Sequence, residues 1–164
     1  MTKSISMDAA DWKLLDLLQR DASRTNQDLA EAAGMSPATC LRRVKRLAAS
    51  GLIRRQVALL DADRLAALAG HGLTAIVEVT LERQDEPRIS AFAARMAQDP
   101  AVQQCYRVAP GPDLVLLVRV HDMPGYAALA QRLFTAELEV RNVRAFFSIA
   151  CLKYETNMPL ALAP

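Results

Sequence analysis

The 164-residue sequence predicts an α+β chain of two domains, a helical domain over residues 1–60 and a β-α-β-β-α-β domain over residues 72–164. Apolar residues recur at helical spacing in the first sixty residues, whereas alternation of apolar and polar side chains begins at Leu73. The alanine-rich residues 61–71 between these patterns are interpreted as a linker that is partly helical. Apolar residues make up 52% of the chain and charged residues 23%, a composition that favours packed cores over disorder.

Three short helices are predicted in the first domain, each with a recognisable start. Asp8 can cap the first helix, whose apolar stripe follows at helical spacing. Thr25 can cap the second helix, with Asp28 at the capping-box position three residues later. Ser36 is suited to cap the third helix, and Pro37 then occupies its first position.

The turn between the second and third helices is the most informative local pattern. Gly34 favours the left-handed conformation that ends a helix, and Met35 supplies an apolar contact beside it. The third helix therefore begins after about three residues, which is the spacing of a helix-turn-helix. Gly51 is expected to end that helix, and residues 52–60 are predicted to be an extended, wing-like segment. The first domain is therefore predicted to be a winged helix-turn-helix.

Basic side chains concentrate on the third helix. The net charge of the chain is only +2, but no acidic residue lies between Glu31 and Asp61, an interval with five arginines and one lysine. Arg42 and Arg46 are four residues apart and lie opposite the apolar side of the helix. Such a helix fits the major groove of DNA, where arginine bonds to guanine or to phosphate. An ordinary surface helix with solvated arginines is the alternative interpretation.

Double-stranded DNA is accordingly the predicted partner. Ser36 and the free amides at the start of the third helix could hold a phosphate. Arg54 and Arg55 could contact the flanking DNA backbone or could simply be exposed strand residues, and the sequence leaves both possibilities open. The candidate DNA-contacting residues are Asn26, Gln27, Ser36, Pro37, Ala38, Thr39, Arg42, Arg43, Arg46, Arg54 and Arg55.

Strand and helix patterns alternate through the second domain in the order of a ferredoxin-like fold. The helices of this fold cover one face of its sheet, and an identical subunit is the simplest cover for the other face. The chain is therefore expected to associate with itself, at least as a dimer. Strands are predicted at residues 73–81, 101–108, 114–120 and 143–152, and helices are predicted to open at residues 85–87 and 122–124.

Several functional classes have no support in the sequence. Cys40, Cys105 and Cys151 are far apart and form no CxxC pair, and His71 and His121 have no cysteine or spaced carboxylate pair nearby. A nucleophile elbow, a Walker loop and a dinucleotide fingerprint are absent. No apolar run approaches the roughly 18 residues of a membrane span. We therefore expect a cytoplasmic protein that is not an enzyme and that has no cofactor, no metal and no membrane partner.

The local features of the first domain combine into one signature, Gly-x-Ser-Pro followed by Arg-Val-x-x-Leu and Gly-x-Ile. It is matched by Gly34, Ser36, Pro37, Arg43, Val44, Leu47, Gly51 and Ile53. With these residues the sequence resembles the Lrp/AsnC (leucine-responsive, asparagine-type or feast/famine) family, and the resemblance covers nearly the whole chain. It implies a prokaryotic, nucleoid-associated transcriptional regulator that forms dimers and larger assemblies such as octamers. It also implies that the second domain senses an amino acid.

The resemblance places the effector between dimers, at the loop joining the second and third strands and near the final strand. The family usually carries Gly-Asp-x-Asp and an aromatic residue in that loop, whereas residues 109–114 here read Ala-Pro-Gly-Pro-Asp-Leu. The effector could therefore differ from leucine, bind through other residues, or be absent. An architectural DNA-binding protein without a ligand and an amino-acid-binding module without DNA binding are the alternatives. The candidate effector-binding residues are Val108, Pro110, Gly111, Asp113, Leu114, Phe146, Phe147 and Ser148.

Overall fold

The computed structural model describes residues 6–69, 72–135 and 139–160. Its contacts divide the chain into two compact units. One unit contains the described residues of 1–59 and 153–164, and the other is Leu60–Leu152. The sequence boundary was expected to leave residues 153–160 with the second domain, whereas the contacts group them with the first.

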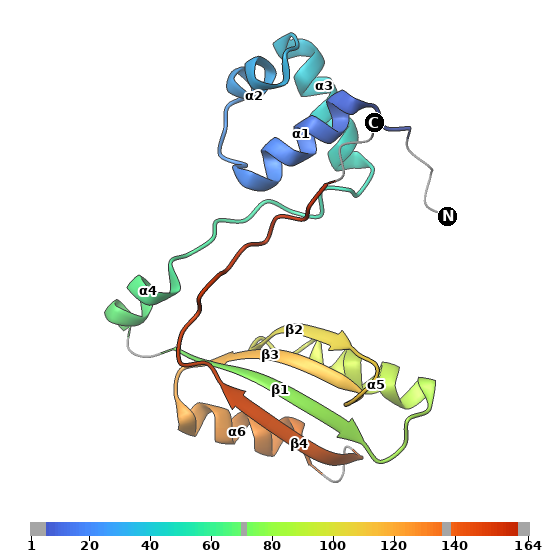
Figure 1. Cartoon of the computed structure of the whole chain (residues 1–164), viewed down its shortest axis with the longest axis vertical. Helices are drawn as coiled ribbons and strands as arrows, with labels where there is room; N and C mark the ends of the chain where they lie inside the picture. Colours follow the sequence, from blue (N-terminus) through green and yellow to red (C-terminus); the bar gives the residue numbers. More distant parts are fainter. Residues whose placement is uncertain (1–5, 70–71, 136–138, 161–164) are drawn as a thin grey trace. The chain divides into compact units, whose positions relative to one another are not determined.

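The first unit contains three helices, α1 (Ala9–Arg20), α2 (Asn26–Ala33) and α3 (Pro37–Ala49) (Figure 1). The three predicted caps are present, since the Asp8, Thr25 and Ser36 side chains each accept a backbone N–H from the first turn of their helix. Gly34 ends α2 with φ 72°, the left-handed conformation that the turn requires. The three helices enclose a small core of Leu14, Leu18, Leu29, Ala30, Cys40 and Leu47.

Residues 52–60, which follow α3, contain no helix or strand. The predicted helical linker contains α4 (Ala62–Ala69), and Gly70 and His71 of the predicted linker lie outside the described residues.

The second unit is a four-stranded antiparallel sheet in the order β2-β3-β1-β4. The helices α5 and α6 lie on one face of it, as Figure 1 shows. Alternate residues of β1, such as Val77 and Val79, point into the core with Phe92 of α5 and Leu129 of α6. This is the predicted ferredoxin-like fold. Its elements are β1 (Leu73–Leu81), α5 (Glu86–Met96), β2 (Val102–Arg107), β3 (Leu114–Val120), α6 (Met123–Leu133) and β4 (Val140–Phe147).

The final strand ends at Phe147 rather than at residue 152, so the predicted end of this strand was wrong. The apolar run continues past Phe147, but β4 pairs with β1, and β1 begins at Leu73. Phe147 is already opposite Ala75, and the amide of Ser148 donates to the carbonyl oxygen of Thr74. Beyond that bond only Leu73 of β1 remains, so the ladder ends there.

Candidate nucleic-acid interface

The start of α3 is fixed by short-range hydrogen bonds. The Ser36 hydroxyl accepts the Thr39 amide at 3.3 Å and donates to the Thr39 hydroxyl at 2.9 Å. From the first turn of α2, the Asn26 side-chain amide donates to the carbonyl oxygen of Pro37 at 2.9 Å. Gln27 and Ala38 are exposed on the same two helices. The helix start is therefore held against α2, and Ser36, Pro37 and Ala38 stay open to solvent.

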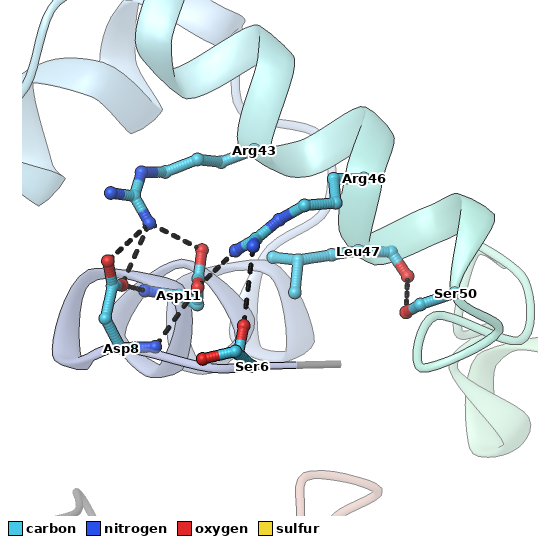
Figure 2. A network of polar contacts seen from close by, with 7 residues as sticks. All are labelled: Ser6, Asp8, Asp11, Arg43, Arg46, Leu47 and Ser50. Atoms are coloured by element: carbon cyan, nitrogen blue, oxygen red, sulfur yellow. Dashed lines mark hydrogen bonds and ion pairs between the residues drawn. The ribbon is translucent and has the colours of Figure 1, made fainter. Parts of the chain in front are cut away.

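The three arginines predicted on α3 have different environments. Arg42 is exposed, and no hydrogen bond or ion pair joins its guanidinium to another residue that the structure describes. The side chain of Arg43 is 24% exposed, and its Nη1 donates to the carboxylates of Asp8 and Asp11 of the first helix region, each at 2.8 Å. Arg46 pairs with Asp11 as well and donates to the carbonyl oxygen of Ser6 at 3.4 Å (Figure 2).

Asp11 is the centre of this network, and only 1% of its side chain is exposed. Burial by itself would raise its pKa, but the hydrogen bonds from Arg46 and Arg43 and the Asp8 backbone together lower the pKa below its usual value. Asp11 is therefore held as a carboxylate between α1 and α3. Among the described residues the Nε of Arg43 is buried without a hydrogen-bond partner, which offsets part of the stabilisation from its two ion pairs.

A surface hollow of about 320 Å³ lies beside the network, lined by Asp8, Arg42, Arg43 and Arg46. Three guanidinium groups and one carboxylate give its lining a positive balance. Sequence reasoning identified these arginines but not Asp8 and Asp11 as their partners. The available signal was the pair of carboxylates three residues apart at the start of the first apolar stripe, which was interpreted only as a cap.

Arg54 and Arg55 lie in the extended segment after α3, and both are exposed. They line a groove that residues of α1 also line, described below, and they do not line the hollow beside Arg42. The structure therefore separates these two arginines from the basic hollow.

The candidate effector residues of the β2–β3 loop are held mainly by backbone contacts. The Asp113 carboxylate is buried and accepts the amide of Leu81 at 2.7 Å, while the Asp113 amide donates to the carbonyl oxygen of Val79 at 3.0 Å. Leu114 is completely buried in the core, and the Val108 amide donates to the carbonyl oxygen of Asp113. Pro110 and Gly111 form the exposed tip of this loop. Asp113 thus ties the loop to the end of β1.

The candidate residues of the final strand lie at the other end of β1. Phe147 packs edge-on against Tyr126 of α6, with ring centroids 4.9 Å apart. Phe146 points to the opposite face, where the Arg144 guanidinium lies 5.2 Å from its ring centroid. Ser148 is bonded to Thr74, whereas Asp113 is bonded to Val79. These two positions of β1 are about 17 Å apart along the strand, which separates Ser148 from Asp113. Within one chain the two groups of candidate effector residues do not meet.

The helix-free face of the sheet carries an apolar band. The strand register places Ile76 between Leu117 and Phe146, and Ile76 is 44% exposed. In the next row Glu78 pairs with Arg144 at 3.5 Å. Within the second unit no described helix covers this band.

Metal-binding clusters and membrane-spanning helices are absent from the described residues. In the part of the chain that the structure describes, no group of three or more histidine, cysteine or acidic side chains could hold a metal ion. No helix in that part is long and apolar enough to cross a membrane.

A helix-turn-helix with a basic third helix, joined to a ferredoxin-like domain, defines a class of DNA-binding regulators that carry their own sensing domain. Residues 7–54 match the family described as winged helix-turn-helix DNA-binding, and residues 74–158 match the Lrp/AsnC ligand binding domain. The chain belongs to the Lrp/AsnC family of transcriptional regulators, as its sequence signature predicted.

Curated relatives and solved structures agree with this assignment. The chain is 35% identical to the leucine-responsive regulatory protein of Rhizobium meliloti, over 93% of this chain and 96% of the relative. It is 33% identical to the glutamate uptake regulatory protein of Zymomonas mobilis, over 94% of this chain and 91% of the relative. The structure of an AsnC family regulator from Agrobacterium tumefaciens matches with a TM-score of 0.82 and 32% identity, covering 93% of this chain and 97% of that one. A Neisseria meningitidis regulator in complex with L-Met matches with the same TM-score and 28% identity, over 95% and 98%.

Proposed function

We propose that this regulator contacts DNA through the start of α3 and through Arg42, while Arg43 and Arg46 hold α3 in position. The observation that carries the proposal is the contrast between neighbouring arginines. Arg43 and Arg46 are bonded to the buried Asp11, whereas the guanidinium of Arg42 has no such partner among the described residues. A free, exposed guanidinium can reach a base edge or a phosphate without first breaking an ion pair.

The hollow beside Arg42 suits a phosphate of the DNA backbone. The N-terminal amides of α3 and the Ser36 hydroxyl lie on the same helix and favour an anion at its start. Together these groups would fix the register of the helix on the duplex, and side chains on its exposed face would contact the bases.

The test is binding of the purified protein to the DNA upstream of its own and neighbouring genes, measured at several salt concentrations. We expect a sequence preference and an affinity that falls steeply with salt, because phosphate contacts release counterions. Arg42→Ala should weaken binding, and Arg95→Ala, which removes an exposed arginine on α5, is the matched control. Equal binding by all three proteins would contradict the assignment of Arg42, and absence of binding at low salt would contradict DNA recognition altogether.

The second part of the proposal is that an amino acid or a related small molecule binds the C-terminal domain. The match to a ligand-binding domain and the L-Met complex of the Neisseria relative support it. One oxygen of the Asp113 carboxylate accepts the Leu81 amide and Asp113 is only 8% exposed, so this carboxylate is a poor partner for the ammonium group of an amino acid. Addition of L-Met, L-Glu and L-Leu to the DNA-binding assay tests this part, and indifference to a full amino-acid panel would favour an architectural role without a ligand.

The protein is proposed to act as a dimer or larger assembly, such as an octamer, in the cytoplasm and on the nucleoid. The apolar band around Ile76 on the helix-free sheet face supports self-association, because water contact with such a band is unfavourable. An effector site that used both groups of candidate residues would require two copies of the chain, because Thr74, which binds Ser148, and Val79, which binds Asp113, lie about 17 Å apart along β1.

A further inference from the structure

The last part of the chain is fastened to the first helix by one side chain. Gln19 of α1 donates from its amide nitrogen to the carbonyl oxygen of Met158 at 2.8 Å. Its amide oxygen accepts the N–H of Met158 at 2.9 Å. The glutamine therefore satisfies both backbone groups of one extended residue, as a neighbouring β-strand would. Residues 19 and 158 are 139 positions apart in the sequence.

The same segment forms one wall of a groove of about 860 Å³ in the first unit. Thr156, Met158 and Leu160 line the groove, and this alternation is expected of an extended segment that turns one side toward a surface. The groove is also lined by Trp12 and Leu15 of α1 and by the residues from 52 to 59. The segment therefore borders this groove with residues 153–159 exposed, and the two hydrogen bonds of Gln19 attach it to α1.

The attachment gives the DNA-binding unit a second connection, which is a noncovalent one at Gln19 and Met158. The chain leaves this unit after Leu59 and returns to it at Lys153. The returning segment follows β4 directly, with only residues 148–152 between them. On the other side, α1 carries both Gln19 near its end and Asp11 at its start, and Asp11 holds α3. The chain that follows β4 is therefore hydrogen-bonded to the same helix, α1, that holds the recognition helix through Asp11.

We propose that residues 153–160 are a strap through which the C-terminal domain restrains the orientation of the helix-turn-helix, with the Gln19–Met158 pair as its fastening. A single flexible connection would let each DNA-binding unit adapt to many half-site spacings, whereas a second connection limits its reach. The strap thus sets how strictly the spacing of half-sites is selected. This inference rests on the DNA-binding function proposed above.

Two variants release the strap in different ways. Gln19→Ala removes both hydrogen bonds, and a chain that ends at Leu152 removes the strap itself. Loss of two neutral hydrogen bonds should raise the undocked fraction about 5- to 30-fold. Gln131→Ala, which truncates an exposed glutamine on α6, is the matched control. The contacts of Asp11 with α3 are untouched by these changes, so the helix-turn-helix should keep its fold.

The first measurement is hydrogen exchange of the C-terminal peptide, followed by mass spectrometry in the full-length protein without DNA. We expect faster exchange in Gln19→Ala than in the parent and in Gln131→Ala, because exchange follows the undocked population. Unchanged exchange in Gln19→Ala would overturn the assignment of Gln19 as the fastening.

The second measurement compares binding to the natural site with binding to the same site carrying five extra base pairs between its half-sites, which is about half a helical turn. The parent and the control should discriminate strongly between these duplexes. Both strap variants should discriminate several-fold less while binding a duplex with a single half-site as tightly as the parent. If a strap variant shows faster hydrogen exchange but discriminates between the two duplexes as strongly as the parent, the proposed role of the strap is wrong. If the parent itself binds no DNA, the proposed function fails, and the exchange experiment distinguishes that result from failure of the fastening.

Discussion

Arg43 on the third helix donates to the carboxylate of Asp11 on the first helix at 2.8 Å, and that carboxylate is almost completely buried. The sequence predicts that Arg43 contacts DNA, but in the structure its guanidinium forms an ion pair that joins two helices of its own domain. Its neighbour Arg42 is exposed and has no ion pair with another described residue. Two adjacent residues of the same type therefore have separable roles, and this separation can be measured.

Arg43→Ala should destabilise the first unit, whereas Arg42→Ala should leave its stability unchanged. Loss of Arg43 removes charge-assisted hydrogen bonds from a buried carboxylate, at a cost of about 1.5–3 kcal/mol. Trp12 is the single tryptophan of the chain and lies on α1, so its fluorescence reports unfolding of this unit specifically. Equal midpoints of urea unfolding for the two variants would show that the Asp11 network contributes nothing to stability.

Arg42→Ala should weaken DNA binding although it leaves the stability of the first unit unchanged. If its guanidinium contacts a base edge, Arg42→Ala relaxes specificity at one position at a cost of about 1–3 kcal/mol. If it contacts a phosphate, all sequences lose affinity alike and the salt dependence becomes shallower. Titration of cognate and mismatched duplexes at several salt concentrations separates these two cases, and unchanged affinity in every case would exclude Arg42 from the interface.

The stability of the first unit should fall in acid through Asp11. The folded protein lowers the pKa of this carboxyl, so its stabilising contribution is complete above the unfolded value of about 3.9 and is lost as pH falls through the lower folded value. Asp11→Asn should therefore be less stable than the parent near neutral pH, and the two should converge as the pH falls below about 4. Urea unfolding followed by Trp12 fluorescence between pH 3 and about 7 measures this. A stability difference that does not change with pH would contradict the ionised state of Asp11.

Asp113 is expected to stabilise the fold of the second unit rather than to bind a ligand. Asp113→Ala leaves the Leu81 amide without its acceptor and should cost about 1–3 kcal/mol, whereas Asp113→Asn retains an oxygen that can accept this N–H. Thermal unfolding of the two variants should therefore differ clearly. If Asp113→Asn keeps its Tm but loses the response to an amino acid, Asp113 binds the effector and this assignment is wrong.

A charge on the helix-free sheet face should prevent self-association. Ile76→Glu places a carboxylate in the middle of the apolar band, and burial of an unpaired charge costs several kcal/mol. The dissociation constant should rise more than about 100-fold, as measured by sedimentation equilibrium. Ser90→Glu on the exposed side of α5 is the control. An unchanged assembly in Ile76→Glu would show that the copies associate through another surface.

Features encoded within a few residues were predictable from the sequence. Each cap joins a side chain to an amide three residues away, so Asp8, Thr25 and Ser36 could be identified without knowing the fold. The alternation of β1 likewise indicated which face of the sheet is buried. The third helix was placed correctly for the same reason.

Contacts between distant residues were not predictable in this way. Arg43 and Asp11 are 32 positions apart, as are Asp113 and Leu81, and helical periodicity does not reveal which exposed arginine meets another helix. Asp113 was a candidate effector-binding residue because the family resemblance places the effector at the loop between the second and third strands. Its burial depends on β1, whose bounds the sequence predicted but whose contact with the β2–β3 loop it did not reveal.

The return of residues 153–160 to the first unit has a consequence for recombination between relatives. The ligand-binding family match ends at Met158 and so includes this segment, whereas the contacts assign it to the DNA-binding unit. A chimera cut once, after residue 60, would therefore pair the groove along α1 with a foreign C-terminal segment. A functional exchange of sensing domains between such regulators should need two junctions, the second near Lys153. Each helix-turn-helix then keeps the C-terminal segment of its own parent protein.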